Sequence, residues 1–487
     1  MVPRLILVCG LLSAIAVDLA WSASGPVVQQ CPTHGEIAPC VCTVKKNGGL
    51  DILCEFTDLQ HISKTMAVLK GKPSLVIFYL KLRHNNLPKL QGFVFLGMDI
   101  RHLTIHNSTL AVVEESSLSS IGKALTQLDL SQNSLSSVPT PALKSLDRLL
   151  IFNLNHNKIS AIHTNAFEGM STLEILTLYE NRLTNIEPNA FAGTEKKLKR
   201  LNIGGNELSR VPTDALQTMD NLKKLEMQEN KITSINEGDF VGLKTLDMLI
   251  LAHNYIKHIP AKVFRHLPLL NSLELDGNQI SHIDEEAFYG LEENLQYLRL
   301  GDNNLHVIPS DSLRRLHRLR HLDLRANNIS SIADDAFTGF GDSITFLNLQ
   351  KNDIKTLPTM SFENLNSLEI LNLQNNKLAR VPEETLEAIV DTATVIDLMD
   401  NPLVCDCDLR WYKDWLLSLK LRDDDDIIQK KHILCYMESE HREYSITNMP
   451  LKNCVGKENS SSSKGSGVKA ELSCVLIFIV LANLRFK

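Results

Sequence analysis

Over most of its length the chain repeats one short pattern of hydrophobic and polar positions, L-x-L-x-x-N-x-L. Its asparagines are Asn85, Asn133, Asn157, Asn181, Asn206, Asn230, Asn254, Asn278, Asn303, Asn327, Asn352, Asn376 and Asn401, and Ser108 takes the position between the first two. Ten residues after each of the first thirteen positions comes a large apolar residue: Phe95, Leu118, Leu143, Phe167, Phe191, Leu216, Phe240, Phe264, Phe288, Leu313, Phe337, Phe362 and Leu386. Steps of 23 to 25 residues held over fourteen positions indicate stacked structural repeats.

Each position of the repeat has its own physical role. In Leu201-Asn202-Ile203 the alternation has a period of two, which predicts a short strand with its apolar side chains pointing inward. One such strand cannot bury its apolar face alone, so neighbouring repeats must stack into a continuous core. The asparagine amide carries two donors and an acceptor, which suits it to bonding buried backbone groups in the turns of adjacent repeats. The pattern therefore predicts an α/β solenoid of about 14 short parallel strands.

Several segments resemble the 24-residue repeats of extracellular leucine-rich-repeat proteins. They are residues 298–305, residues 336–340 and Val381-Pro382. The resemblance covers about residues 31 to 454, and it implies a curved leucine-rich-repeat horseshoe with its strands on the concave face. It is much less informative about function, because one fold serves many functions.

Eight of the ten cysteines form two groups at the ends of the repeats. The groups are Cys31, Cys40, Cys42 and Cys54, and then Cys405, Cys407, Cys435 and Cys454. Even numbers at both ends of a secreted chain favour disulfides, and neither group has the C-x2-C spacing that structural zinc sites prefer. Cysteines separated by one residue do not readily bond each other, which leaves two of the three connectivities open for each group.

The family resemblance implies that both groups are disulfide caps. It favours pairing first to third and second to fourth: Cys31–Cys42, Cys40–Cys54, Cys405–Cys435 and Cys407–Cys454. The N-terminal intervals are longer than in the compact cap of the family, so the pairing there is the less constrained. Residues 401–411 look like the C-terminal cap of the family, with Trp411 and Trp415 as its buried aromatic residues.

The two ends of the sequence are typical of processing signals. Arg4, an apolar run over residues 5–17 and small residues up to Ser24 predict a secretory signal peptide over residues 1–24. The apolar tail over residues 472–484 is too short to span a membrane comfortably. Preceded by a serine- and glycine-rich segment, it predicts a glycosylphosphatidylinositol anchor attached at Ser460, with residues 461–463 and Gly465 as alternative attachment sites. The alternative to an anchor is a short, tilted transmembrane helix.

Five regions follow from these boundaries. They are the signal peptide 1–24, an N-terminal cysteine cap 25–72, leucine-rich repeats 73–400, a C-terminal cysteine cap 401–455, and a Ser/Gly linker with a hydrophobic anchor signal 456–487. We therefore expect an extracellular protein, either held on the outer leaflet of the plasma membrane or secreted.

Composition and motifs argue against catalysis. The sequence has no H-E-x-x-H, no G-x-S-x-G after a strand and no G-x-x-x-x-G-K, so we predict that it is not an enzyme. We also expect no cofactor, no metal and no nucleic-acid partner. The run Asp423–Asp426 lacks the ligand spacing of a calcium loop. Histidines at exposed strand positions, His321 among them, are interpreted as solvated.

The concave face offers candidate ligand-binding residues: Tyr179, Tyr297, Arg299, Asp323, Arg325 and Phe346. Tyrosine and arginine dominate binding hot spots, because they bury much area with few torsions to freeze. The alternative is a ladder in which Arg299, Asp323 and Arg325 neutralise one another.

Two further features concern carbohydrate. A basic run contains Arg314, Arg315, Arg318 and Arg320. These arginines could attract an anionic glycan although the net charge of the chain is −7. The alternative is that they only form a solvated surface on the outer side of the repeats. Glycosylation sequons occur at Asn107, Asn328 and Asn459. A glycan on Asn107 would obstruct part of the concave face.

The hypothesis that fits best is a surface-anchored adhesion or recognition protein whose ligand is an extracellular or cell-surface protein. In this it resembles the chaoptin and connectin type of lipid-anchored repeat protein. Only residues 485–487 follow the apolar tail, so we expect no cytoplasmic signalling domain. The alternatives are an innate-immune-type receptor or co-receptor, or a non-catalytic subunit of a secreted enzyme complex. For the latter, residues 37–42 are similar to the repeat subunit of a secreted crustacean luciferase.

Overall fold

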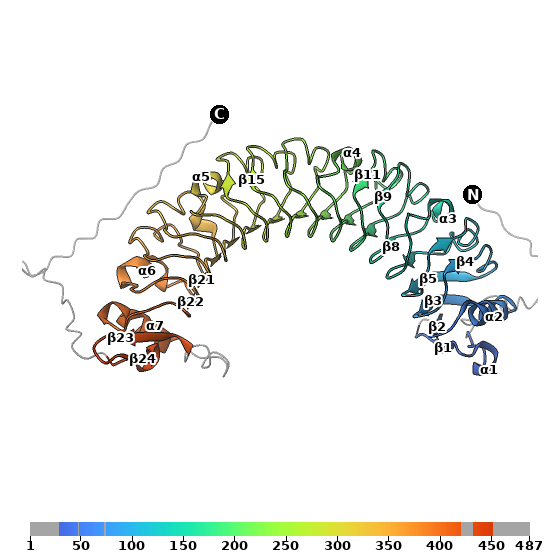
Figure 1. Ribbon diagram of the computed structural model, residues 1–487, viewed down its shortest axis with the longest axis horizontal. Coiled ribbons are helices and arrows are strands. Elements are labelled where there is room, and N and C mark those ends of the chain that lie inside the picture. Colours follow the sequence, from blue (N-terminus) through green and yellow to red (C-terminus); the bar gives the residue numbers. More distant parts are fainter. Residues whose placement is uncertain (1–28, 47, 73–74, 420–431, 451–487) are drawn as a thin grey trace, which may run out of the picture.

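A computed structural model of the chain describes residues 29–46, 48–72, 75–419 and 432–450, which form a curved arch (Figure 1). The strands line the inner, concave side, and loops with short helices form the outer side. The predicted signal peptide, linker and anchor signal lie outside the described residues, as do Asp423–Asp426, Cys454, Asn459 and Ser460. Among the described residues, none of the helices combines the length and the hydrophobicity needed to cross a membrane.

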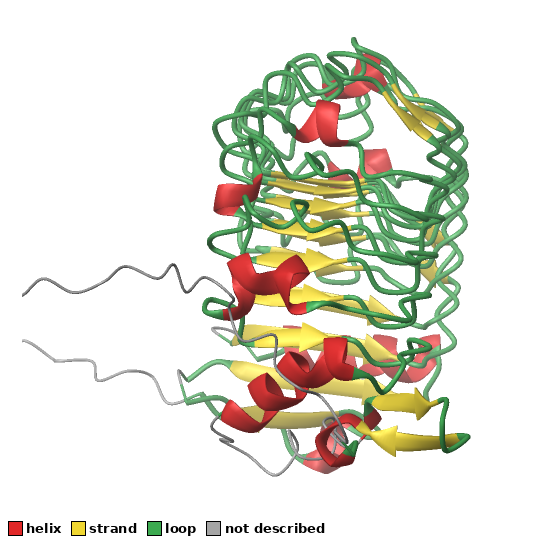
Figure 2. Cartoon of the chain, turned by 90° about the vertical axis from the view of Figure 1, so that its left-hand side faces the viewer, coloured by secondary structure: helices red, strands yellow, loops and turns green. Residues whose placement is uncertain are grey.

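One long sheet runs through the described part of the arch, and Figure 2 shows its strands stacked side by side. Its sixteen strands are, in order, β1 (Val41–Val44), β2 (Leu50–Glu55), β3 (Val76–Arg83), β5 (Asp99–His106), β7 (Gln127–Asp129), β8 (Ile151–Asn153), β10 (Ile175–Thr177), β12 (Arg200–Asn202), β13 (Lys224–Glu226), β14 (Met248–Ile250), β16 (Ser272–Glu274), β18 (Tyr297–Arg299), β19 (His321–Asp323), β20 (Phe346–Asn348), β21 (Ile370–Asn372) and β22 (Val395–Asp397). Within this sheet only β1 pairs antiparallel, with β2, and all the other strand pairs are parallel. The predicted leucine-rich-repeat horseshoe of parallel strands is confirmed.

The remaining elements lie on the outer loops and at the two ends. Three parallel pairs of two-residue strands are β4 (Lys89–Leu90) with β6 (Val112–Val113), β9 (Ala161–Ile162) with β11 (Asn185–Ile186), and β15 (His258–Ile259) with β17 (His282–Ile283), and an antiparallel pair is β23 (Leu434–Met437) with β24 (Arg442–Ser445). The α-helices are α1 (His34–Ile37), α2 (Leu59–Lys70), α3 (Thr140–Leu143), α4 (Thr213–Leu216), α5 (Ser310–Leu313), α6 (Glu383–Val390) and α7 (Arg410–Ser418), with 3-10 turns at Gly341–Ser343, Cys407–Leu409 and Ile446–Asn448.

The core is continuous along the arch, as the repeat pattern predicts. The central residues of neighbouring strands pair in register, for example Leu201 with Leu225 and Leu225 with Leu249, and all three are fully buried. The large apolar residues ten positions after each pattern asparagine are all buried. Where they are phenylalanines in adjacent repeats, their rings lie against each other, as in Phe240 and Phe264 with centroids 5.8 Å apart.

The pattern asparagines bond adjacent turns in the predicted way. Asn254 is 4% exposed, and its Oδ1 accepts a hydrogen bond from the N–H of Ile232 at 3.1 Å. Its Nδ2 donates to the carbonyl oxygens of Met227 and Leu251, each at 3.0 Å. Because the same pattern recurs from turn to turn, the side chains form a ladder that satisfies buried backbone groups between repeats.

Disulfides lie near both ends of the arch. Three of the pairings expected from the family resemblance are confirmed: Cys31–Cys42, Cys40–Cys54 and Cys405–Cys435. Cys407 is also disulfide-bonded, but its expected partner Cys454 lies outside the described residues.

Helix α7 lies against the last repeats through three aromatic residues. Trp411 and Trp415 are buried as expected, and Trp411 Nε1 donates to the carbonyl oxygen of Val381 at 2.8 Å. Tyr412, which the sequence analysis did not single out, is the most buried of the three. Its hydroxyl donates to the carbonyl oxygen of Ile396 at 2.7 Å. Burial raises the pKa of this hydroxyl.

Candidate ligand-binding face

Three aromatic side chains stand side by side on strands β18, β19 and β20. The strand register pairs Tyr297 with His321 and His321 with Phe346. The next residue of each strand is a leucine buried in the core, so the period of two turns these rings to the concave side. The rings of His321 and Phe346 stack with centroids 4.0 Å apart and planes within 2°. The Tyr297 ring lies 5.9 Å from that of His321.

His321 corrects one interpretation from the sequence. We expected a solvated histidine, but it lies half-buried between Tyr297 and Phe346. Burial, and then the positive charge of Arg299, lower the pKa of His321, so its imidazole is neutral at physiological pH. A signal was present in the sequence, because Tyr297, His321 and Phe346 occupy one position of the repeat, 24 and 25 residues apart.

Two arginines flank these rings, and they differ in how firmly they are held. Arg325 Nη1 donates to Asp323 Oδ2 at 2.9 Å, and its Nε lies 3.5 Å from Asp302 Oδ2. Glycine at 301 leaves room for this side chain, since a Cβ there would come within 3.0 Å of Arg325 Cγ. Arg299 is exposed, and its nearest carboxylate is that of Glu274, at 3.8 Å.

Asp323 positions Arg325 and is itself hidden from solvent. It is 3% exposed, and its Oδ1 also accepts from the backbone N–H of Arg325 at 3.0 Å. Burial raises the pKa of this carboxyl, although the hydrogen bond from Arg325 opposes that shift. Of the alternative ladder of Arg299, Asp323 and Arg325, the ion pair between Asp323 and Arg325 is present, whereas Arg299 pairs with Glu274.

Tyr179 lies apart from the other five candidates. It follows β10, which is five strand spacings from β18, or about 24 Å along the sheet. Its hydroxyl donates to Glu229 Oε2 at 2.8 Å, and this bond raises the pKa of the tyrosine to about 12. Tyr297, Arg299, Asp323, Arg325 and Phe346 are therefore the local group, and we call them, together with His321, the central aromatic cluster.

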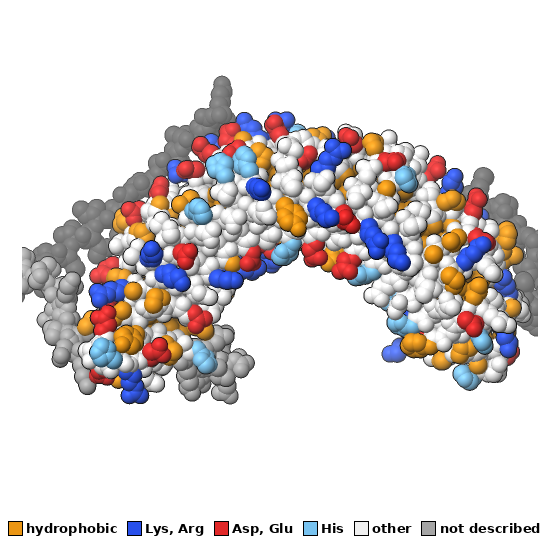
Figure 3. Space-filling view, viewed as in Figure 1, with side chains coloured by type: hydrophobic (Ala, Val, Ile, Leu, Met, Phe, Trp, Pro, Cys, Tyr) orange, Lys and Arg blue, Asp and Glu red, His pale blue; other side chains and the backbone are white. Residues whose placement is uncertain are grey.

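Charged and histidine side chains follow the inner edge of the arch around its middle (Figure 3). Asn107, at the N-terminal part of the concave face, is exposed at the end of β5, and its Nδ2 bonds His84 Nδ1 at 2.9 Å. Asn328 is also exposed. The glycosylation of both asparagines stays a prediction.

The basic run does not form one patch. Arg314 and Arg315 line a depression with Glu285 and Glu286, whereas Arg318 and Arg320 line another that also holds Glu293 and Glu369. All four arginines are exposed. The acidic groups in both depressions reduce the local positive potential, so the structure adds no support to the predicted binding of an anionic glycan.

Comparison of the sequence with known protein families finds the same repeats that the structure shows. The leucine-rich-repeat family matches residues 147–196, 196–256, 245–293 and 293–354, and a related repeat pattern matches residues 124–146. The chain is a leucine-rich-repeat solenoid. A comparison with curated proteins finds no match to its sequence.

Two solved structures illustrate the fold. A leucine-rich-repeat protein of Leptospira interrogans is 21% identical with a TM-score of 0.55, and the match covers 74% of this chain and 92% of that one. Toll, in the Toll–Spatzle complex of Drosophila, is also 21% identical, with a TM-score of 0.60 and coverage of 77% of this chain. The solenoid spans about half of the Toll chain, since the match covers 51% of it.

Proposed function

We propose that this solenoid is an extracellular, non-catalytic binding scaffold that recognises a protein ligand through the central aromatic cluster. The observation that carries the proposal is the row of Tyr297, His321 and Phe346, with Arg299 exposed beside it. Aromatic area next to an unburied guanidinium is the composition of a binding hot spot.

The cluster is organised before any ligand arrives. His321 is held between two rings, and Arg325 is held by Asp302 and Asp323, so few torsions remain to be frozen on binding. Tyr297 is still 46% exposed and can bury further area against a partner. The strands beneath are fixed by the core and by the asparagine ladder, which keeps these side chains at constant spacing.

Two further features support an extracellular protein-recognition role. The disulfides at both ends are of the kind that form and persist in oxidising compartments. The Toll–Spatzle complex is built on the same fold, which favours a protein as the partner here. We therefore retain adhesion or recognition at the cell surface as the proposed role.

The experiment has two stages. A soluble protein comprising residues 25–458 is used first to capture partners from cell surfaces, and the affinity of the captured partner is then measured for variants. Tyr297→Ala and Phe346→Ala should each weaken binding at least about tenfold, because they remove buried contact area at a hot spot. Arg299→Glu tests the charge, and it is preferred to a change at Arg325, because losing Arg325 would leave the buried Asp323 without its partner.

A matched control is available on the outer side. Tyr289 is 46% exposed, as Tyr297 is, but it follows the buried Phe288 on the outer loops. Tyr289→Ala should leave affinity unchanged. Full affinity in the Tyr297 and Phe346 variants would move the ligand site elsewhere on the arch. A secreted enzyme as the captured partner would favour the role of a non-catalytic enzyme subunit.

Membrane attachment is tested separately. Phosphatidylinositol-specific phospholipase C should release the protein from intact cells, because we expect a lipid anchor at Ser460. Mass spectrometry of the released protein should then detect no peptide containing Cys474, since the apolar tail is removed when the anchor is attached. Retention on the membrane together with a detectable Cys474 peptide would establish a spanning helix instead.

A further inference from the structure

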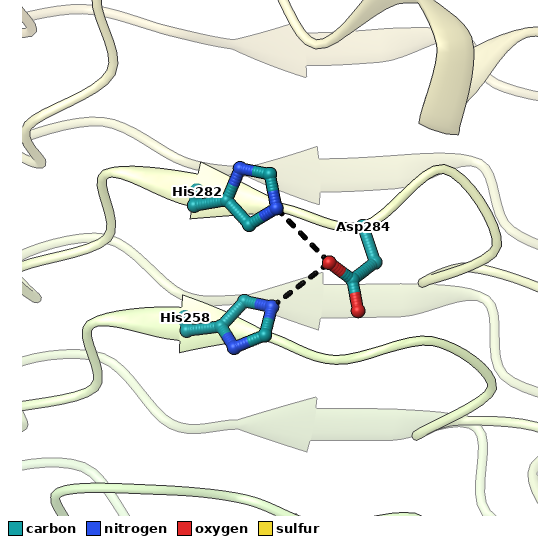
Figure 4. A group of neighbouring side chains, drawn as sticks. All are labelled: His258, His282 and Asp284. Atoms are coloured by element: carbon teal, nitrogen blue, oxygen red, sulfur yellow. Dashed lines mark hydrogen bonds and ion pairs between the residues drawn. The ribbon is translucent and has the colours of Figure 1, made fainter.

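Three side chains with metal-binding chemistry meet on the outer loops, away from the central aromatic cluster. Strands β15 and β17 pair in parallel, which places His258 beside His282 on the adjacent repeat. Asp284 follows β17 directly and turns toward both rings (Figure 4).

The three side chains converge on one point. His258 Nε2 and His282 Nε2 each lie 3.0 Å from Asp284 Oδ1, and the imidazole centroids are 5.1 Å apart. One ligand atom from each residue can be chosen so that all lie within 4.8 Å of one another. The other carboxylate oxygen, Oδ2, accepts from the backbone N–H of Ala261 at 2.9 Å, which fixes the orientation of the carboxylate.

We propose that His258, His282 and Asp284 form a binding site for a divalent transition-metal ion of the zinc type. Two imidazoles and one carboxylate are a donor set that zinc accepts, and three protein ligands leave a fourth position for water or a side chain of a partner. Calcium and magnesium prefer all-oxygen sites, so the two imidazoles select against them. The bond from Ala261 to Oδ2 acts as the outer support that metal-bound carboxylates usually have.

Binding requires only small movements of exposed groups. His258 and His282 side chains are 49% and 69% exposed, so both rings can turn without disturbing the core. Zinc–ligand bonds are about 2.0–2.2 Å long. To bind one ion, the two Nε2 atoms and Asp284 Oδ1 would lie slightly farther apart than the 3.0 Å of the hydrogen bonds found here. In that arrangement each Nε2 gives its lone pair to the metal, and the proton of each neutral ring resides on Nδ1. The two hydrogen bonds to Oδ1 are replaced by metal–ligand bonds.

No metal is expected from the cysteine groups or from the run of aspartates. The sequence does carry a signal for this site, because His258 and His282 are 24 residues apart, which equals the repeat length. Residues one repeat apart are neighbours in a solenoid. Beside the pair of strands β9 and β11, a single histidine lies against a carboxylate. There His163 Nδ1 lies 2.9 Å from Glu187 Oε1.

Zinc titration of the purified protein, prepared without a polyhistidine tag and freed of metal by a chelator, tests the proposal. Isothermal titration calorimetry should show one saturable Zn²⁺ site that Mg²⁺ does not occupy. His258→Ala, His282→Ala and Asp284→Asn should each weaken this site by more than about tenfold, since loss even of an outer support commonly costs that much. Zn²⁺ should also raise the melting temperature of the unsubstituted protein, because it binds the folded state.

His163→Ala is the matched control, because His163 is 69% exposed, as His282 is, and also contacts a carboxylate. It should bind zinc like the unsubstituted protein. Circular dichroism should show all four variants folded, since the replaced side chains lie outside the core. Equal zinc affinity in all variants, or no saturable binding by the unsubstituted protein, would reduce the three residues to a hydrogen-bonded ladder and overturn the proposal.

Discussion

Replacing Phe264 with alanine should lower the free energy of unfolding by about 3–5 kcal/mol. The ring is fully buried between those of Phe240 and Phe288, at centroid distances of 5.8 and 6.1 Å. Both neighbours are held by their own repeats, so they cannot collapse into the space that the substitution opens. Denaturant unfolding followed by circular dichroism measures the change.

Tyr255→Ala is the control, because Tyr255 is an aromatic residue of the same repeat that is 49% exposed. Its replacement should change stability by less than about 0.5 kcal/mol. A solenoid can also lose one region before the rest, since each repeat contacts only its neighbours. Hydrogen exchange across β14, β16 and β18 will show whether the loss is local. Equal stability of the Phe264 and Tyr255 variants would contradict the role of the aromatic row in the core.

The fold could be predicted because the same physical requirement recurs in every repeat. A departure from the pattern at one position, such as Ser108 in place of asparagine, does not hide the repeat, because the other thirteen positions keep the asparagine. Strand β2 was not counted, because its segment lacks the pattern asparagine. It joins the parallel sheet nevertheless, since Asn85 of the next repeat donates to the carbonyl oxygen of Cys54 and accepts from the N–H of Thr57.

The concave site was predictable in composition but not in its contacts. Alternation with a period of two identifies the side chains that face the ligand side, and it indicated Tyr297, Arg299 and Phe346 individually. It does not choose between Glu274 and Asp323 as the partner of Arg299, because both lie at the same strand position on either side of it. That choice depends on burial, which commits Asp323 to Arg325.

His321 was misjudged for a related reason. It was interpreted alone, and an exposed strand position favours a solvated imidazole. Comparison across repeats would have placed His321 between two aromatic rings and His258 beside His282. In a solenoid the useful neighbour of a residue lies one repeat away, so functional groups are better sought down the columns of aligned repeats than along the chain.

The ladder gives the second large effect: Asn254→Ala should destabilise the protein by about 1–3 kcal/mol. The substitution removes the side-chain acceptor of the Ile232 N–H. It also removes one of the two asparagine donors to each of the Met227 and Leu251 carbonyl oxygens, which keep their bonds from Asn230 and Asn278. Burial keeps water from replacing these bonds. The change in melting temperature and in denaturant midpoint measures the cost.

Two further variants distinguish loss of the ladder from loss of side-chain volume. Asn304 is exposed directly after the ladder residue Asn303, so Asn304→Ala should leave the melting temperature unchanged. The melting temperature of Asn254→Ser should lie between those of Asn254→Ala and the unsubstituted protein. The serine at position 108 shows why, since its hydroxyl donates to the Leu82 carbonyl oxygen at 3.2 Å and accepts from the Asn85 N–H at 3.3 Å. Equal melting temperatures for Asn254→Ala and the unsubstituted protein would rule out a stabilising ladder, whatever the serine variant does.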